Sequence, residues 1–261
     1  MSVLLTIYLW ASHVHAILRD APRNRTVIDI GCGTGWFPNT VAYHYGLKVV
    51  AIDLCKQALE RAGQISRALG ISGKIEFHHA DIFNLNVNDI FYLVNSIGVL
   101  HHTHDCHKAI RMVSQLVAED GFFNLGLYHS YGREPFLNLF KQYIDKLAQC
   151  GALSADEEAE AYAIFRGLNS NLSDETLIRS WFRDQVLHPF ETQHSFQEIY
   201  ELLTSLKFQI LSTSVNDFKP IDDVQSLFEL EKTFYDRSVE KNVNRKTYYP
   251  GFFTVLAKLN I

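Results

Sequence analysis

Three glycines at alternate positions follow a short apolar run and could form a ligand-binding loop. The run Thr26–Ile30 leads directly into Gly31, Gly33 and Gly35. Glycine suits a backbone with positive φ and lets a ligand approach where a Cβ would block it. The spacing is GxGxG, and the bulky Trp36 stands where the dinucleotide fingerprint has its third glycine. The pattern therefore disfavours a pyrophosphate and favours an anion such as a carboxylate at the start of the next helix.

Carboxylates lie before the glycine loop and after the next two apolar runs. Asp53 ends the second run and can accept hydrogen bonds from both hydroxyls of a ribose. Asp81 follows the third run and can accept from an exocyclic adenine amine, and Asp29 can face an ammonium group. Asp53 and Asp81 could instead cap a helix or a turn. The set suits a ligand that combines a ribose, an adenine and a cationic amino acid.

Four side chains that could act as a general base follow two later apolar runs. They are His101, His102, Tyr128 and His129. An open α/β sheet builds its site at the carboxyl ends of neighbouring strands, which is where these residues are expected. Each histidine could equally be a hydrogen-bonded polar residue of the core. Arg133 could bind an acidic group of a substrate or pair with a carboxylate of the protein.

Two groups of residues have the ligand types of a zinc site. Residues 101–107 (HHTHDCH) contain four histidines, one aspartate and one cysteine. Metal ligands must converge on one point, however, whereas these run through a loop into a helix. The second group is His188, Glu191 and His194, for which contacts that cap a loop are the simpler interpretation. We therefore expect no metal site.

The elements that must position these residues follow from the apolar periodicity. Short β-branched and aromatic runs predict strands at 26–30, 48–52, 74–78, 91–96, 122–128, 208–215 and 252–259. Helical spacing predicts helices at 37–45, 58–69, 109–117 and 196–206. Glu119–Gly121 is expected to be a turn, and Ser195 with Glu198 forms a capping-box pattern. Alternating strands and helices predict a parallel sheet with helices on both faces.

The regular alternation ends after Tyr131. Residues 133–190 have helical patterns without a strand of comparable quality, and an insertion of that length beside a site favours a lid or substrate cap. We therefore expect an N-terminal helix at 1–25, a ligand-binding domain at 26–132 and 191–261, and a helical cap at 133–190. The later aromatic residues are expected to form the core of this cap. They are Phe136, Phe140, Tyr143, Trp181, Phe182, Phe190 and Phe196.

Composition excludes several classes of protein. The 261 residues are 47% hydrophobic, which is enough for a core and excludes a disordered chain. The net charge of −5 argues against a general nucleic-acid binder. No apolar run is long enough for a membrane-spanning helix. The apolar start, MSVLLTIYLW, is expected to pack on the domain as an amphipathic helix, with an interfacial membrane helix as the alternative. Four cysteines without a CxxC pair fit reduced thiols in a cytoplasmic protein.

Several of these segments resemble those of the class I S-adenosylmethionine-dependent methyltransferases. IDIGCGTG is similar to the first motif of that family, VVAIDL with Asp53 to the second, and HADIF with Asp81 to the third. Residues 95–103 (NSIGVLHHT) resemble a segment of the ubiquinone and menaquinone methyltransferase branch. The resemblance implies a Rossmann-like α/β fold with a seven-stranded, mostly parallel sheet. Helices would cover both faces, and the helical cap would be inserted before the sixth strand.

The resemblance also implies S-adenosylmethionine as the cofactor. The residues it assigns to cofactor binding are Asp29, Gly31, Cys32, Gly33, Gly35, Asp53, Leu54, Asp81, Ile82, Ser96 and Ile97. The glycines would shape the bed for the methionine part, and Asp29 would help to hold its amino group. Asp53 would bind the ribose, with Leu54 on the adenine and Asp81 at the adenine edge. Ser96 and Ile97 would flank the methionine part near the sulfonium.

The function expected from these residues is methyl transfer to a small-molecule acceptor, which would be partly apolar if cap aromatics face the site. Such transfer is an in-line displacement that depends on positioning, and a base helps when the acceptor is a hydroxyl. The alternatives are a tRNA or protein methyltransferase, and a non-catalytic binding protein with the same fold. A nicotinamide dehydrogenase is opposed by Trp36 and by the glycine spacing. The acceptor atom and the oligomeric state are not indicated.

Overall fold

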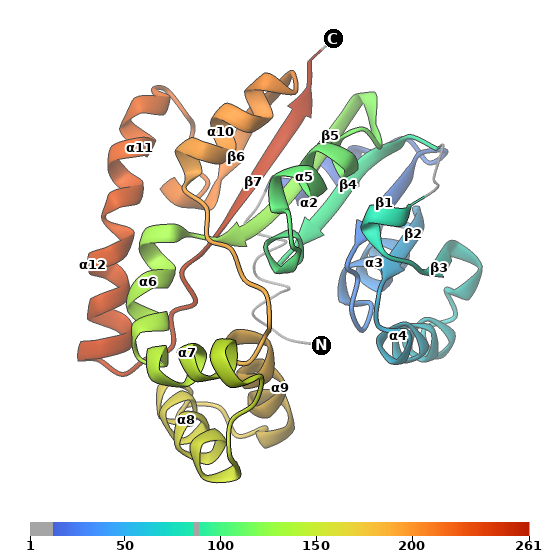
Figure 1. Ribbon diagram of the computed structural model, residues 1–261. Coiled ribbons are helices and arrows are strands. Elements are labelled where there is room, and N and C mark those ends of the chain that lie inside the picture. Colours follow the sequence, from blue (N-terminus) through green and yellow to red (C-terminus); the bar gives the residue numbers. More distant parts are fainter. Residues whose placement is uncertain (1–12, 86–88, 261) are drawn as a thin grey trace.

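The computed structural model describes residues 13–85 and 89–260, and its centre is a seven-stranded sheet (Figure 1). The strands are β1 Thr26–Ile30, β2 Lys48–Asp53, β3 Ile75–His79, β4 Phe91–Ile97, β5 Val117–Tyr128, β6 Phe208–Thr213 and β7 Phe252–Leu259. Their order is β3-β2-β1-β4-β5-β7-β6. All neighbouring pairs are parallel except those of β7, which is antiparallel to both β5 and β6. The predicted apolar helix at the N-terminus falls largely outside the described residues.

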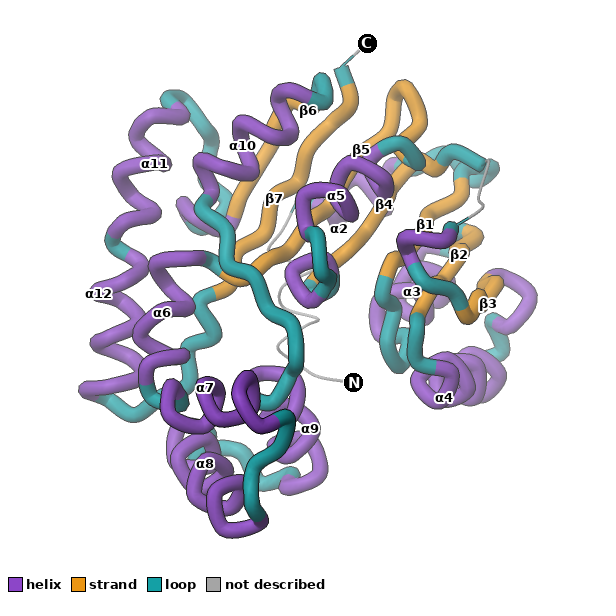
Figure 2. The backbone as a smooth tube through the Cα atoms, viewed as in Figure 1, coloured by secondary structure: helices purple, strands orange, loops and turns teal. Residues whose placement is uncertain are grey.

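Helices cover both faces of the sheet (Figure 2). One face packs against α2 (Val14–Asp20), α3 (Trp36–Thr40) with the π-helical turn Val41–Tyr45, and α4 (Lys56–Ala68). The other face packs against α5 (Cys106–Ser114), α10 (Phe196–Ser205) and α11 (Val224–Lys232). Successive residues of a strand point to opposite faces, so Val27 joins the first core and Ile28 the second. The predicted fold class, a Rossmann-like and mostly parallel sheet, is confirmed.

Strand β5 begins earlier than the sequence predicted. Glu119–Gly121, expected as a turn before the strand, lie within β5 at a point where the backbone folds back on itself. Phe91 pairs with Val117 and Leu93 with Phe122, so β5 carries extra residues as a bulge. A Cβ at Gly121 would lie 2.9 Å from the carbonyl oxygen of Ala118. Glycine therefore allows the backbone to fold back tightly within the strand.

Four helices follow β5 and pack around a core of their own. They are α6 Ser130–Asn138, α7 Lys141–Cys150, α8 Ala155–Leu168 and α9 Glu175–Gln185. Phe136, Phe140 and Phe182 are buried in this core, as predicted for the aromatic residues. Two of those predictions are wrong: Phe190 is 58% exposed, and Phe196 packs in the core of the sheet. Figure 1 shows α7, α8 and α9 beyond the carboxyl ends of β4 and β5.

A second helical insertion lies between β6 and β7, where only a polar and aromatic stretch was expected. It contains α11, α12 (Phe234–Ser238) and a π-helical turn, Val239–Asn244. Helix α12 stands beside α6, with the buried Phe234 facing Gly132, and α11 lies next to α10 (Figure 1). Their narrow apolar stripe explains why periodicity did not reveal them. Within the described ranges, no helix has the length and apolarity needed to cross a membrane.

Candidate functional site

The glycine loop joins the end of β1 to α3. Gly31 has φ +74° and Gly35 has φ +80°, both in the left-handed region. A Cβ at Gly31 would lie 2.3 Å from Cγ2 of Val99, so glycine is required for the loop to pack on that side chain. The amide groups of Gly31 and Cys32 both donate to the carbonyl oxygen of Ile52, at 2.8 and 2.9 Å. Because these two amides already bind a carbonyl of the protein, they are not available to bind a phosphate. The loop can still accommodate a ligand through its shape.

Asp53 is held in place at the end of β2 by two backbone amides. Oδ2 accepts from the amide of Gly33 at 2.6 Å, and Oδ1 accepts from the amide of Cys55 at 2.7 Å. A carboxylate oxygen has a second lone pair, so both oxygens can still accept from ribose hydroxyls. The helix-cap contact and the predicted ribose contact are therefore compatible. The neighbouring Leu54 is 69% exposed, and an apolar surface beside a fixed carboxylate suits the face of an adenine.

Asp81 lies at the same edge of the sheet as Asp53. Strand β3 ends at His79, whose Nε2 lies 2.9 Å from the carbonyl oxygen of Leu54. Oδ1 of Asp81 accepts from the amide of Phe83 at 2.9 Å, which is the turn contact that the sequence left open. The second oxygen is 3.3 Å from Nδ2 of Asn84. Each oxygen keeps a lone pair for an amine donor.

Asp29 lies beneath the loop and is only 3% exposed. Its Oδ1 accepts a hydrogen bond of 2.6 Å from Nδ2 of Asn95. Burial raises the pKa of the Asp29 carboxyl to about 7, and the nearby Asp53 charge adds to the increase while the Asn95 hydrogen bond opposes it. The predicted contact with an amino group is therefore not open in this conformation. Asp29 can influence a ligand only through its charge below the loop.

Two other predicted contact residues are also buried. Ser96 has no exposed surface, and its hydroxyl donates to the carbonyl oxygen of Ile30 at 3.2 Å, which ties β4 to β1. Cys32 is buried below the loop, and burial raises the pKa of its thiol. Both therefore support the loop instead of facing a ligand. Ile82 and Ile97 are half-buried and keep some surface at the carboxyl edge.

Trp36 provides a hydrogen-bond donor that was not predicted from the sequence. There, only the bulk of its side chain was considered, as a reason to exclude a pyrophosphate ligand. Its indole Nε1 is buried and has no hydrogen-bond acceptor among the residues that the structure describes. A buried donor without a partner costs free energy unless a ligand supplies an acceptor. Trp36 directly follows Gly35, so an acceptor such as a carboxylate on the loop would satisfy it.

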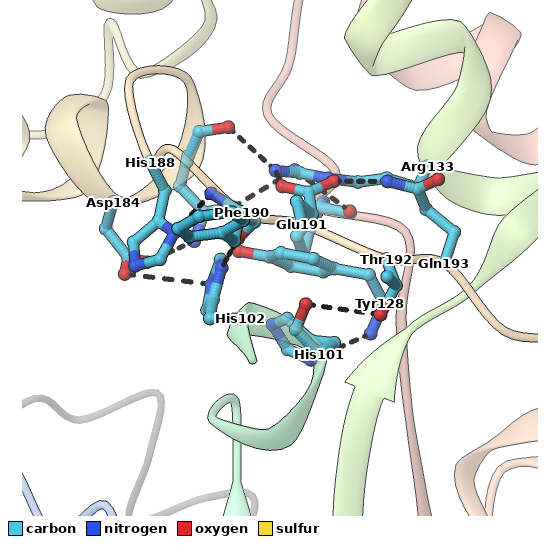
Figure 3. A network of polar contacts seen from close by, with 12 residues as sticks. His101, His102, Tyr128, Arg133, Asp184, His188, Phe190, Glu191, Thr192 and Gln193 are labelled. Carbon is cyan, nitrogen blue, oxygen red and sulfur yellow. Dashed lines mark hydrogen bonds and ion pairs between the residues drawn. The ribbon is translucent and has the colours of Figure 1, made fainter. Parts of the chain in front are cut away.

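His101 and His102 form the turn that follows β4, next to Val99 and the glycine loop. The His101 ring has no exposed surface and stacks on Tyr128, with ring centroids 4.1 Å apart (Figure 3). Its Nδ1 accepts from the backbone amide of Tyr128 at 3.3 Å. Burial lowers the pKa of His101 well below its usual value, so the ring is neutral and its proton is on Nε2. That ring can only donate from Nε2.

In His102 the two ring nitrogens have the opposite roles from those in His101. Its Nδ1 lies 2.8 Å from the carbonyl oxygen of Phe190, which can only accept, so Nδ1 carries the proton. Burial lowers the pKa of His102, which keeps the ring neutral and leaves a lone pair on Nε2. This Nε2 has no hydrogen-bond partner among the described residues, and Asp184 Oδ1 is 4.0 Å away. Figure 3 shows His188 against the His102 ring, with centroids 3.9 Å apart.

Tyr128 and His129 do not keep their predicted role as bases. Burial raises the pKa of the Tyr128 phenol, so it stays protonated at neutral pH. His129 has no exposed surface; its Nδ1 accepts from the amide of Gly132, and its Nε2 donates to Oε2 of Glu231 at 2.8 Å. Both ring nitrogens are therefore engaged within the fold. We correct the His129 prediction to a structural contact between β5 and α11.

Of the two roles predicted for Arg133, the structure shows the ion pair with a carboxylate of the protein. The side chain has no exposed surface, and it forms a bidentate ion pair with Glu191 at 2.8 and 2.6 Å. Its other N–H groups donate to Gln185 and to the carbonyl oxygen of Pro250. Figure 3 shows the guanidinium beside the Glu191 carboxylate, and its carbon lies 3.8 Å from the centre of the Tyr128 ring. Because every donor is used, the expected contact with an acidic substrate group is replaced by a contact that joins α6 to α9.

A cavity of about 320 Å³ lies between α6, α7 and the residues after α9. Its size is within the range of pockets for small molecules. The lining is Leu137, Asn138, Lys141, Ile144, Asp145, Gln185, Val186, His188, Pro189, Glu191 and Gln193. Apolar and polar side chains are mixed in this lining. His188 lines the cavity and also contacts the His102 ring, so the cavity is adjacent to the side chain that carries the lone pair on Nε2.

A family model described as a methyltransferase domain matches residues 22–165, which is more than half of the chain. The chain belongs to this family. The matched residues of the methyltransferase domain include the glycine loop, Asp53, Asp81 and the His101–His102 pair, and they extend into α8. The elements that build the site are therefore those that the family model covers.

Curated relatives of the methyltransferase domain are distant or match over a short length. An uncharacterized protein of Synechococcus sp. is 22% identical over 207 residues, which cover 73% of this chain and 49% of that protein. Norajmaline N-methyltransferase of Rauvolfia serpentina is 35% identical over 98 residues, 37% of this chain and 33% of that protein. The chain thus spans about half, or less, of the length of these relatives.

The fold of the domain is also that of a solved structure. The structure of PKMT2 from Rickettsia typhi in complex with AdoHcy is similar with a TM-score of 0.64 and 15% identity. The similarity covers 95% of this chain and 52% of that one. At that identity the likeness supports the arrangement of the sheet and helices.

Proposed function

We propose that the chain is an S-adenosylmethionine-dependent methyltransferase (EC 2.1.1.-) that methylates a small-molecule acceptor with His102 as general base. Membership of the methyltransferase domain family supports the reaction type. The order of the glycine loop, Asp53 and Asp81 along the sheet edge supports the cofactor. The single observation that carries the role of His102 is its buried Nε2, a lone pair without a partner among the described residues.

The residues present fit the proposed cofactor. Asp53 has lone pairs for the ribose hydroxyls, and the exposed Leu54 offers an apolar face to the adenine. The unpartnered Nε1 of Trp36 suits the methionine carboxylate, and the Asp29 charge suits the ammonium group. When bound, the cofactor supplies an electrophilic methyl group on a sulfonium. The loop contains no lysine or arginine, as expected for a ligand without phosphate.

His102 is the best base of the four candidates. The Phe190 carbonyl fixes its tautomer, and burial keeps the ring neutral, so Nε2 is ready to take a proton from a hydroxyl or an amine. The proton would form an imidazolium, and the carboxylate of Asp184, 4.0 Å from Nε2, would stabilise its charge. His101 presents the complementary group, an Nε2–H donor without a partner in the described part of the chain. The pair thus offers one acceptor and one donor to the substrate.

The acceptor is proposed to bind under the helical cap at 133–190. The cavity beside His188 combines apolar side chains such as Leu137 and Ile144 with polar ones such as Lys141, which suits a partly apolar small molecule. Nucleic acid is disfavoured by the net charge of −5. On the basis of the NSIGVLHHT segment, we propose that the chain belongs to the ubiquinone and menaquinone branch of the family.

The test separates cofactor binding from chemistry. Binding of S-adenosylhomocysteine is measured by calorimetry with NADH as the control, and transfer of labelled methyl groups is measured on a panel of apolar phenols, amines and acids. His102→Gln is expected to keep the affinity for S-adenosylhomocysteine and to lower turnover at least about 100-fold. His104→Gln, the same change at an exposed neighbour, is the matched control.

Each result has a distinct meaning. Equal turnover in His102→Gln and His104→Gln would remove the base role, and an equal loss of cofactor binding and turnover would make His102 structural. A wild-type protein that binds NADH, or that does not bind S-adenosylhomocysteine, would overturn the cofactor assignment.

A further inference from the structure

Three potential metal ligands converge on one point outside the proposed catalytic site. His107 lies at the start of α5, His194 directly before α10, and Glu198 in the first turn of α10. Nε2 of His107 is 2.5 Å from Oε1 of Glu198, and Nδ1 of His194 is 2.8 Å from the same oxygen. One ligand atom from each residue lies within 4.8 Å of the others. His194 is buried whereas the other two are partly exposed, so an ion can reach the group from solvent.

One tautomer of His194 directs the lone pair of Nδ1 at the carboxylate of Glu198. The Thr192 hydroxyl donates its one proton to the carbonyl oxygen of His101 at 3.2 Å. The same hydroxyl lies 2.9 Å from Nε2 of His194 and accepts from it in the tautomer that carries the proton on Nε2. Nδ1 then has a lone pair directed at the carboxylate of Glu198. A cation placed between this lone pair and the Glu198 carboxylate would be bound by both.

We propose that His107, His194 and Glu198 bind a divalent transition-metal ion, with Zn²⁺ the best match. Two imidazoles and one carboxylate form a three-ligand set that zinc uses in proteins, with water in the fourth position. Ca²⁺ and Mg²⁺ prefer sites built from oxygen ligands. The Thr192 contact is the outer hydrogen bond that orients a metal-bound histidine.

The distances require a small rearrangement when the ion binds. Tetrahedral zinc with bonds of about 2.0–2.1 Å separates its ligand atoms by about 3.3 Å. The present separations of 2.5 and 2.8 Å must therefore increase by less than about 1 Å. Glu198 is 37% exposed, so its side chain has room to move. The sequence did not reveal this set, because it takes one histidine from each of two groups that were considered separately.

The ion would fix residues 190–194, the segment whose Phe190 carbonyl sets the tautomer of His102. The amide of His194 donates to the carbonyl oxygen of Tyr128, and the amide of Thr192 donates to that of His101. Phe190, which holds Nδ1 of His102, belongs to the same segment. A metal that joins His194 to α5 and α10 would hold this segment against the sheet. Its role is to hold this segment in place, and the proposal does not rest on the proposed methyl transfer.

The experiment uses the full-length protein stripped with EDTA and then titrated with Zn²⁺ by calorimetry and with Co²⁺ by visible absorption. One ion per chain is expected, with the absorption of a tetrahedral cobalt site and a higher melting temperature. Glu198→Gln and His107→Asn are expected to weaken binding at least tenfold. Glutamine also completes a capping box, so Glu198→Gln preserves the start of α10. His78→Asn is the matched control, since His78 is exposed and lies 3.8 Å from Glu76.

Three outcomes would overturn the proposal. The first is a protein that binds neither ion. The second is binding that is undiminished in Glu198→Gln and His107→Asn. The third is a cobalt spectrum with a thiolate charge-transfer band, because that band would place the ion at a cysteine such as the exposed Cys55 or Cys150.

Discussion

Asn95 donates a hydrogen bond of 2.6 Å from its Nδ2 to Oδ1 of the buried Asp29. Asn124 donates in turn from its Nδ2 to Oδ1 of Asn95, also at 2.6 Å. The three residues are register partners on β1, β4 and β5, so they form a polar row across the middle of the sheet. Burial disfavours the charged carboxylate more than the amide hydrogen bond favours it. The row therefore holds Asp29 near its titration point, with a pKa of about 7.

Replacement of Asp29 by asparagine should remove a pH dependence of stability. The folded pKa of about 7 is above the ordinary aspartate pKa of 3.8, so the folded state binds the proton more tightly. Stability from this group is full below about pH 4 and is lost as the pH rises to about 7. Between pH 5 and 8, we expect the free energy of unfolding of the wild type to fall by about 2.5 kcal/mol relative to Asp29→Asn.

The Asp29 prediction is checked by urea unfolding of both proteins at pH 5, 6, 7 and 8. The amides of Asn95 and Asn124 can reverse together, so an asparagine at position 29 can donate and the row stays intact. Asn95→Asp is not a suitable control, because it would add a second buried carboxyl. A difference between wild type and Asp29→Asn that does not change with pH would contradict the raised pKa.

Substitution of Asp53 by alanine should weaken S-adenosylhomocysteine binding more than tenfold, or about 1.4 kcal/mol or more. The ribose would lose its acceptor, and the amides of Gly33 and Cys55 would lose theirs. Asp53→Asn separates the loss of the ribose contact from the loss of the two amide contacts. The remaining side-chain oxygen of asparagine can still accept from one of the two amides. Asp89→Ala, at an exposed carboxylate before β4, controls for the change in net charge. Calorimetry that finds the same affinity in Asp53→Ala and wild type would remove the ribose assignment.

The sheet was predictable from the sequence because its central strands β1, β4 and β5 bury most of their residues. Thr26–Ile30 and Phe252–Leu259 were predicted with the ends that the structure has, since β-branched and aromatic runs are bounded there by turn residues. The capping box of Ser195 and Glu198 is present at α10, also as predicted. Helices α11 and α12 escaped detection because they bury few residues against α6 and α10, so their apolar stripe is narrow.

The site was predictable only in part, because partners distant in the sequence set the chemistry of each histidine. His101 and His102 are adjacent in the chain, yet one accepts at Nδ1 from Tyr128 and the other donates from Nδ1 to Phe190. These contacts decide which nitrogen has a free lone pair. The role of Arg133 likewise depends on Glu191, which lies beyond three further helices. Residue type and spacing cannot reveal such pairs.

His129→Gln should destabilise the protein and leave the proposed base untouched. The buried Glu231 accepts from His129 and from the amide of Phe196 at 2.5 Å, where α10 begins. Loss of the imidazole leaves a buried carboxylate with fewer donors, so we expect a loss of about 1–3 kcal/mol in the free energy of unfolding. The measurement is denaturant unfolding, together with turnover at a temperature where the variant is folded. A variant of normal stability with lost turnover would restore His129 as a catalytic candidate.

Arg133→Lys should lower stability rather than substrate affinity. The guanidinium lies 3.8 Å from the centre of the Tyr128 ring, and all five of its N–H groups donate to Glu191, Gln185 and Pro250. A lysine ammonium cannot reproduce this planar fork, so one buried carboxylate oxygen would lose its donor. We expect a loss of about 3 kcal/mol in the free energy of unfolding, as for other broken buried ion pairs.

The double variant Arg133→Met with Glu191→Leu tests whether the loss of stability in Arg133→Lys comes from the broken ion pair. It removes both charges together, so it should be destabilised by less than the sum of the two single variants. Arg245→Lys, at an exposed arginine paired with Glu240, is the matched control and should change stability by less than about 1 kcal/mol. If Arg133 instead bound an acidic substrate group, Arg133→Lys would raise KM and leave the unfolding midpoint unchanged. Stability measured without substrate and KM measured on the folded variant therefore separate the two roles.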